Sequence, residues 1–300
     1  MNLRVGAAVE PPLAMPSFRK VALVLLLGAL PACEIQECDN EETGADGICL
    51  KSLKRFEGNS ITQSADYTTD IDLVVFNPNG NLSIVRGRES DRLEVTFEPF
   101  VLRAHDVSRE EAEEDLAELE VSLSQSGRAF FVETRRPSGT RGSLGADVRI
   151  ALPTNFASVL DVDQHNGRTE IDFIGDSPSL ILSSENGDCD LVTGYAEHIS
   201  VLCENGDLRA SVLGVAPQTG SGFATGNGSL ELSFPSDGVF SVQAQALAGG
   251  SVISELPENC LLNAASDSAK TASCNGATDL DPVYSAVADG TGLADVVLSF

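Results

Sequence analysis

The chain has 300 residues and a formal net charge of −26, with 45 acidic against 19 basic residues. Nucleic acid is not expected as a partner, because that binding depends on Lys and Arg side chains that neutralise phosphates. A hydrophobic fraction of 42% allows a real core in one or two domains, and an aromatic fraction of 5% with abundant small residues suits an all-β protein. The acidity is explained by solubility, with cation binding on an acidic face as the alternative.

Residues 1–32 are predicted to be a signal peptide. A basic pair at 19–20 precedes an apolar run of ten residues, which is too short to span a bilayer. The sequence Leu-Pro-Ala-Cys that ends at Cys33 resembles the lipobox of bacterial lipoproteins, although Pro31 is atypical for it. A lipidated Cys33 would anchor the chain to a membrane, with the outer membrane or cell surface favoured over the inner membrane. An ordinary secretory peptide, cut at the same bond, is the alternative.

Seven cysteines are present, and lipidation of Cys33 leaves six in three local pairs separated by 11, 14 and 14 residues. An extracytoplasmic protein meets an oxidising compartment, where disulfides form and persist. Six cysteines allow fifteen connectivities; pairing between nearest neighbours predicts three disulfides, Cys38–Cys49, Cys189–Cys203 and Cys260–Cys274. The first would close an acidic tether at 33–55.

Residues 56–152 are predicted to be a β-rich part with one inserted helix. Residues 72–87 form a first copy of a repeat, with its turn at Asn79-Gly80. Ser108 and Glu111 have the spacing of a capping box and predict a helix at about 108–119. The loop at 135–145 then carries the only basic patch in this acidic sequence. A solvated loop is the simpler explanation, and a partner contact the sharper one, for its arginines Arg135, Arg136 and Arg141.

Residues 153–300 contain four more copies of the repeat and a disulfide-closed excursion at 256–278. Each copy is an apolar alternation, then Asn-Gly, then more alternation, and the steps between copies are 20, 19 and 22 residues. A repeat of this period is typical of stacked architectures. The pairs are Asn166-Gly167, Asn186-Gly187, Asn205-Gly206 and Asn227-Gly228.

An Asn-Gly pair flanked by alternation is ordinarily a hairpin signal, and that alternative has to be tested here. In a two-residue hairpin Glu204 would face Asp207, and Glu185 would face Asp188. Like charges directly opposite each other are unfavourable. If the copies are stacked as parallel coils instead, the apolar residues align in inward columns, and Arg209 falls between Asp190 and Glu231 on neighbouring coils.

These columns predict a single-stranded β-solenoid, right-handed and triangular, with coils of about 20 residues and one short inserted helix. Each glycine would supply the positive φ that a corner requires, and the asparagines would form a hydrogen-bonded ladder. Cys189 and Cys203 would both point inward beside one corner on adjacent coils. The ends need covers, because an open end is a sticky strand edge; the helix and the 256–278 excursion are the candidates.

The coil Asn-Gly-x-Leu-x-Ile-x-x-Gly at 79–87, the helix-bearing insertion, the lead-in Ile-Ala-Leu-Pro at 150–153 and the repeated Asn-Gly-Asp coils together resemble a known family. It is the bacterial putative adhesin β-solenoid family of unknown function, which is related to auto-transporter adhesin head domains. The resemblance covers about 56–300. It implies a non-enzymatic role in the cell envelope and supplies no catalytic residues. The cysteines and the lipobox depart from the family pattern.

The function expected from the sequence is therefore a non-enzymatic adhesin or structural module, with no cofactor and with an envelope protein or glycan as partner. No phosphate loop, HExxH motif or nucleophile elbow occurs, and His165 and His198 share no column. A β-helix carbohydrate-active enzyme, or a calcium-dependent glycan-binding protein, is the alternative. It would use the outward carboxylates Asp161, Asp163, Glu170, Asp172, Asp188, Asp190 and Asp207. The coils leave no room for cleft-forming loops, and few aromatic platforms for sugars exist (Tyr67, Tyr195 and Tyr284). The oligomeric state is not predictable.

Overall fold

The computed structural model describes residues 53–104, 106–137, 143–172, 177–194, 196–213, 221–246, 251–254, 260–277, 283–288 and 295–299. All the described residues belong to one compact unit, 50–300. The predicted signal peptide, Cys33 and the Cys38–Cys49 pair lie outside these ranges. Within them, no helix is both long and apolar enough to cross a membrane.

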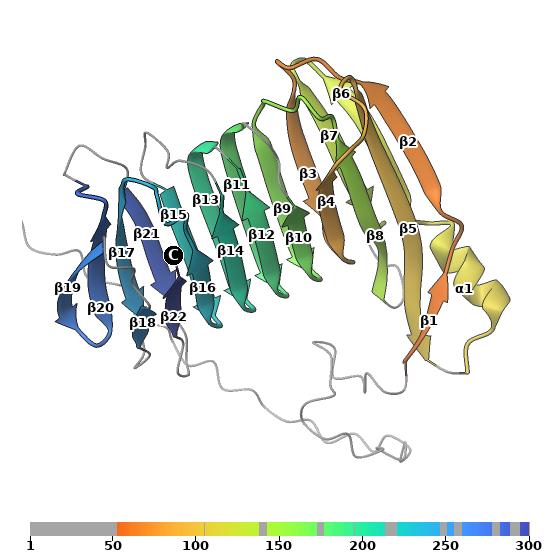
Figure 1. Cartoon of the computed structure of the whole chain (residues 1–300). Helices are drawn as coiled ribbons and strands as arrows, with labels where there is room; N and C mark the ends of the chain where they lie inside the picture. Colours follow the sequence, from red (N-terminus) through yellow and green to blue (C-terminus); the bar gives the residue numbers. More distant parts are fainter. Residues whose placement is uncertain are drawn as a thin grey trace, which may run out of the picture. The chain divides into compact units, whose positions relative to one another are not determined.

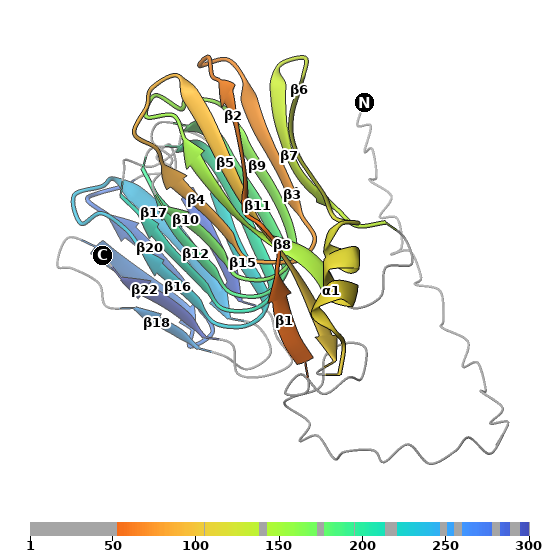
Figure 2. The ribbon, with the colours of Figure 1, turned by 90° about the vertical axis from the view of Figure 1, so that its right-hand side faces the viewer.

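The described chain is all-β apart from one helix, and its strands form two sheets of eleven strands each (Figures 1 and 2). The first sheet contains β1 (Leu53–Glu57), β2 (Ile61–Asp66), β4 (Leu82–Arg86), β5 (Arg92–Ala104), β8 (Ser143–Leu152), β10 (Thr169–Asp172), β12 (Cys189–Thr193), β14 (Leu208–Val212), β16 (Leu230–Ser233), β18 (Val252–Ser254) and β22 (Val296–Ser299). The second contains β3 (Asp72–Asn77), β6 (Glu120–Ser126), β7 (Ala129–Arg135), β9 (Leu160–Asn166), β11 (Ser177–Asn186), β13 (Ala196–Asn205), β15 (Ser221–Asn227), β17 (Phe240–Ala246), β19 (Cys260–Ser266), β20 (Ala269–Cys274) and β21 (Val283–Ala288).

Each repeat contributes one strand to each sheet. The pairs β9/β10, β11/β12, β13/β14 and β15/β16 stack in parallel, and the Asn-Gly corners lie in register from coil to coil. The predicted stacking of the copies is therefore present, and the hairpin alternative is wrong. Alternation places one apolar set inward on both strands of every coil, and these side chains form one continuous core between the sheets.

The described strands of the coils form two sheets, and the third sheet that a triangular prism would require does not occur among the described residues. Residues that would have built a third side instead lengthen β11 and β13 within the second sheet, where Ser177 pairs with Ala196 and Ser179 with His198. Buried and more exposed side chains alternate over 179–184, as expected for one strand that continues within a single sheet. The handedness of the coil stays a prediction.

The spatial order of the coils departs from the chain order at both ends of the stack. The first coil, β3/β4, lies between β7/β8 and β9/β10. The last, β21/β22, lies between β15/β16 and β17/β18. Strand β22, although it comes last in the chain, thus forms an interior strand with hydrogen-bonded neighbours on both sides.

At the N-terminal end, β2 of the first sheet contacts β6, the edge strand of the second sheet. The Gln63 side chain on β2 accepts a hydrogen bond from the backbone N–H of Leu123 (2.6 Å) and donates to the carbonyl of Val121 on edge strand β6 (3.4 Å). Helix α1 (Arg109–Leu116) begins with the predicted capping box between Ser108 and Glu111. It covers a small apolar cluster made by Phe56, Val101, Ala112 and Leu144.

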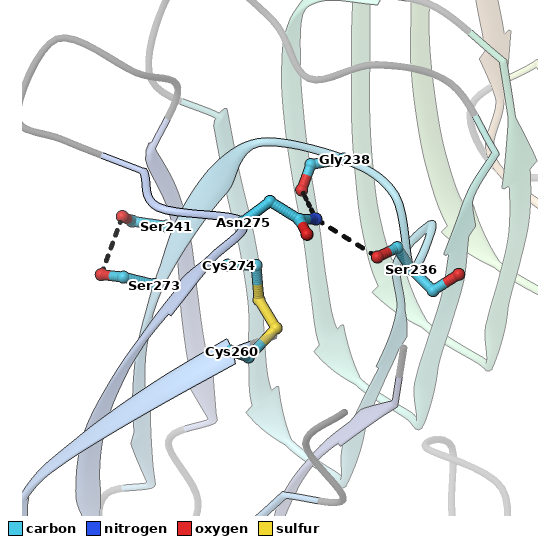
Figure 3. Close-up of a disulfide and its surroundings, with 7 residues drawn as sticks. All are labelled: Ser236, Gly238, Ser241, Cys260, Ser273, Cys274 and Asn275. Atoms are coloured by element: carbon cyan, nitrogen blue, oxygen red, sulfur yellow. Dashed lines mark hydrogen bonds between the residues drawn. A yellow bond between two sulfur atoms is a disulfide. The ribbon is translucent and has the colours of Figure 1, made fainter. Parts of the chain in front are cut away.

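At the C-terminal end, the hairpin β19–β20 pairs with β17 and is closed by the predicted Cys260–Cys274 disulfide (Figure 3). The Asn275 side chain next to it donates to the carbonyls of Ser236 (3.2 Å) and Gly238 (2.6 Å). The hairpin turn also reaches the first sheet, where Val252 donates its backbone N–H to the carbonyl of Asp267 (2.9 Å). The described part of the predicted 256–278 excursion, residues 260–277, thus covers this end of the stack.

Candidate functional site

The corner asparagines form the predicted ladder. From the second asparagine onward, each side-chain amide donates to the side-chain oxygen of the asparagine one coil earlier, with N···O distances of 3.0, 3.1, 3.1 and 2.8 Å. The ladder runs through Asn79, Asn166, Asn186, Asn205 and Asn227. Three members also donate to a backbone carbonyl of the preceding coil. The asparagines thus lock one coil onto the next and leave little of their amide for a ligand.

The corner glycines are required mainly by close approach of the coils. A Cβ atom built on Gly167 would lie 2.2 Å from the carbonyl oxygen of Gly80, and one on Gly187 would lie 2.3 Å from that of Gly167. The same collision, at 2.0 to 2.2 Å, would occur at Gly80, Gly206 and Gly228. Positive φ accompanies it at several corners, with values of 119°, 127° and 125° at Gly80, Gly167 and Gly187. The predicted reason, positive φ alone, is therefore incomplete.

The aspartates that follow Asn-Gly are also engaged at the corner. The Asp188 carboxylate accepts the backbone N–H of Asp207 (3.0 Å), and the Asp207 carboxylate accepts that of Ser229 (2.9 Å). At the first coil, Asn81 accepts the N–H of Arg168 in the same manner (3.0 Å). Asp188 and Asp207, which the sequence offered as carboxylates for metal binding or acid–base chemistry, are therefore structural residues of the corner.

The outer face of the first sheet carries a charged ladder. Arg209 lies in register between Asp190 and Glu231, as predicted, with N···O distances of 3.6 and 3.7 Å. Arg168 contacts Asp190 at 2.6 Å and Glu170 at 3.0 Å. Hydrogen bonding and charge attraction from Asp190 raise the pKa of the Arg168 guanidinium. Two arginines thus bridge successive coils along this face.

The remaining outward acids lie apart from this ladder. Asp161 and Asp163 are on β9 and face outward from the second sheet, the opposite side of the core from Glu170 and Asp172 on β10. Burial, and then the nearby Asp163, raise the pKa of the Asp161 carboxyl. The seven carboxylates singled out in the sequence are therefore divided among two faces and a corner. Among the described residues no group of His, Cys, Asp and Glu is placed to hold a metal ion.

Cys189 and Cys203 are buried thiols, so the predicted bond between them is absent. Both point inward beside one corner, as predicted. The Cys203 thiol donates to the carbonyl of Gly187 (3.1 Å), just as the Thr225 hydroxyl one coil later donates to that of Gly206 (3.0 Å). A hydrogen bond with Cys189 and burial raise the pKa of the Cys203 thiol well above its ordinary value. Cys203 therefore has the role of a polar corner residue.

The predicted basic loop is only partly described. Arg135 ends β7 and forms an ion pair with Glu133 of the same strand (2.8 Å). Arg136 follows it as an exposed residue, and Arg141 lies outside the described residues. Of the tyrosines, Tyr67 and Tyr284 are buried in the core, and Tyr195 is also outside the described part. Two of the three tyrosines are thus excluded as sugar platforms.

A pocket on the outer face of the first sheet was missed from the sequence. It lies over β4, β5 and β8, has a volume of about 340 Å³, and is lined by Val85, Arg86, Gly87, Arg88, Glu89, Arg92, Glu94, Arg149 and Ala151. The stretch Arg-Gly-Arg-Glu-Ser-Asp-Arg at 86–92 was a signal, because it gathers three arginines in an acidic chain. The fourth, Arg149, comes from a strand distant in sequence, which only the pairing of β4 with β8 brings alongside.

No family model matches this chain, and no curated protein matches it either. Among solved structures it is similar to a "putative cell adhesion protein" from Clostridium sporogenes, at 10% identity and a TM-score of 0.43, covering 80% of this chain and 100% of that one. A "putative adhesin" from Bacteroides fragilis follows, at 11% identity and a TM-score of 0.27, with 80% and 97% covered. A "putative lipid binding protein" from Parabacteroides distasonis has 12% identity and a TM-score of 0.25, with 80% and 97% covered. These likenesses are too distant to assign a role to this chain.

Proposed function

We propose that this chain is a non-enzymatic, extracytoplasmic lipoprotein that acts as an adhesin-like surface module. In this proposal the signal peptide is removed, Cys33 carries the lipid, and the tether at 33–55 spaces a right-handed β-solenoid from the outer membrane or cell surface. The partner is an envelope protein or glycan that meets exposed side chains on the solenoid.

One observation carries the proposal: the polar residues of the repeat are engaged with each other. The asparagines hydrogen-bond to one another, and the carboxylates of Asp188 and Asp207 accept backbone N–H groups. Arg168 and Arg209 form ion pairs with carboxylates of neighbouring coils. A catalytic acid and base need a shared substrate position within hydrogen-bond reach of both. The outward carboxylates are divided between opposite faces instead, which supports binding over turnover.

The test is co-sedimentation of the full chain, purified in detergent, with envelope polysaccharide, together with a size analysis of the polymer. We expect saturable retention of the protein, with the polymer length unchanged over long incubation. Depolymerisation that is lost in Asp161→Asn or Glu170→Gln would refute the non-enzymatic role. An absence of retention on any envelope fraction would refute the binding role.

A further inference from the structure

We propose that the pocket over β4, β5 and β8 binds an acidic saccharide. In this arrangement the carboxylate of a uronic acid contacts the arginines, and its hydroxyl groups donate to Glu89 and Glu94. The proposal deepens the surface-binding role given above and rests on it only for the extracytoplasmic setting. It assigns a ligand class to residues outside the repeated corner.

Strand pairing explains how the arginines converge. Arg149 on β8 lies in register between Ser83 on β4 and Thr96 on β5, so its side chain stands on the outer face in the middle of three strands. Val85 and Ala151 pair two residues further along the same strands, on the same face, and form a small apolar floor. The turn after β4 carries Arg88 and Glu89 to the rim. The backbone N–H of Gly87 bonds to the carbonyl of Leu152 (2.6 Å) and holds this turn against β8.

The electrostatics of the pocket are unusual for this protein. Within the described ranges, Arg88 and Arg149 are exposed and no carboxylate lies within ion-pair distance of either guanidinium. Most arginines elsewhere in the described chain have such a partner, namely Arg55, Arg103, Arg109, Arg128, Arg135, Arg168 and Arg209. Four arginines against two glutamates leave an excess of two positive charges on a chain with a formal charge of −26. An oxyanion would supply the missing partner.

Two of the arginines are held by neighbours, which reduces the entropy lost on binding. The Arg92 guanidinium donates to the hydroxyl of Ser64 on β2 (2.7 Å), and that of Arg86 donates to the carbonyl of Thr154 (3.2 Å). Guanidinium groups bind carboxylates and phosphates through paired N–H donors, and such charge-assisted bonds are about twice as strong as neutral ones. The pocket is thus positioned for a planar oxyanion.

The two glutamates favour a saccharide over a simple anion. Glu89 and Glu94 line the same pocket, and the described chain offers their carboxylates no side-chain donor. Phosphate at neutral pH carries up to two negative charges and would be repelled by them. A uronic acid carries one negative charge and several hydroxyl donors, so it can satisfy arginines and glutamates together. The volume of about 340 Å³ lies within the usual range of small-molecule sites.

The test measures binding by calorimetry with the full chain in detergent. The probes are a short oligogalacturonate, its neutral methyl ester, inorganic phosphate and a poly-glutamate peptide. We expect the oligogalacturonate to bind, the ester to bind at least about tenfold more weakly, and Arg149→Gln or Arg88→Gln to weaken oligogalacturonate binding by about tenfold, which corresponds to about 1.4 kcal/mol. Arg128→Gln is the control, since it removes the same charge from the Asp70 ion pair on the other sheet.

Glu94→Gln separates a saccharide from a simple anion. It should weaken the oligogalacturonate, because a neutral amide oxygen is a weaker hydroxyl acceptor than a carboxylate, and it should strengthen phosphate, because it removes a repelling charge. The proposal is overturned if Arg149→Gln binds like the wild type, if phosphate or the peptide binds more tightly than the saccharide, or if nothing binds at millimolar concentration. Retention of the chain on envelope fractions despite such a failure would leave the surface-binding role standing and place its contact elsewhere.

Discussion

Gly187 provides the sharpest stability prediction. An alanine there would place its Cβ atom 2.3 Å from the carbonyl oxygen of Gly167 on the preceding coil, at a φ of +125°. A strained backbone of this kind costs about 1–3 kcal/mol. Relief of the contact must also separate the coils and weaken the bonds that Gly167 and Asn166 make to Asn186, at about 1 kcal/mol each. Gly187→Ala should therefore destabilise the fold by roughly 3–5 kcal/mol.

The assay is thermal unfolding followed by circular dichroism, where this loss should lower Tm by roughly 6–20 °C for a domain of this size. Gly222→Ala is the matched control, because Gly222 lies in the same stack two coils further along, nothing lies within 4 Å of its added Cβ, and its φ is not restrictive. It should change stability by less than about 1 kcal/mol, in the stabilising direction. Equal melting of the two variants would refute the close-packed corner.

Three further predictions concern charge and thiols. Arg209→Glu places three carboxylates in register and should cost about 1 kcal/mol at low salt; the loss in Tm should shrink when ionic strength rises from about 0.01 M to about 1 M, and a salt-independent loss would contradict it. Because the pKa of Asp161 is raised, the folded chain holds this proton more tightly than the unfolded chain, and the ionised carboxylate opposes folding at neutral pH. Asp161→Asn should therefore raise Tm slightly at pH 7, and the gain should vanish near pH 3, below the ordinary Asp pKa; a gain that is larger in acid would have the wrong sign. Cys189 and Cys203 should be protected from iodoacetamide in the folded chain and should react once the chain is denatured, with no reductant needed, as measured by peptide mass spectrometry. If reductant were needed, the two thiols would be bonded to each other.

The corner could be predicted because repetition makes its chemistry visible in the sequence. The asparagine ladder, the position of Arg209 and the capping box of α1 each follow from residue types at fixed spacings, and the structure confirms all three. Like-charge conflicts at Glu185 and Glu204 were enough to exclude hairpins. The Cys260–Cys274 disulfide closes a local hairpin and was accessible to nearest-neighbour pairing for the same reason.

The remaining features depend on contacts that spacing does not encode. Strands β11 and β13 stay paired with each other over ten residues, from Ser177 and Ala196 to the asparagine corner, where a triangular coil would have turned. The exchanged order at both ends joins strands far apart in the chain, such as β4 with β8 and β16 with β22. The arginine pocket follows from the first of these pairings. The spacing of Cys203 from Cys189 suggested a disulfide. In the structure its thiol donates to the carbonyl of Gly187, which is the same role that the Thr225 hydroxyl has one coil later.

The central claim is that the Asn-Gly pairs are stacked corners and that the strands after them pair in parallel. Cysteines at positions 170 and 190, introduced by Glu170→Cys and Asp190→Cys, test it directly. These residues are register partners on neighbouring strands, where the strand spacing of about 4.8 Å suits a disulfide. Peptide mapping under mild oxidation should find a 170–190 bond, and no bond in the control pair Glu170→Cys and Arg209→Cys, which is two strands apart. A 170–209 bond, or a failure of 170–190 to form in folded protein, would contradict the stacked corner.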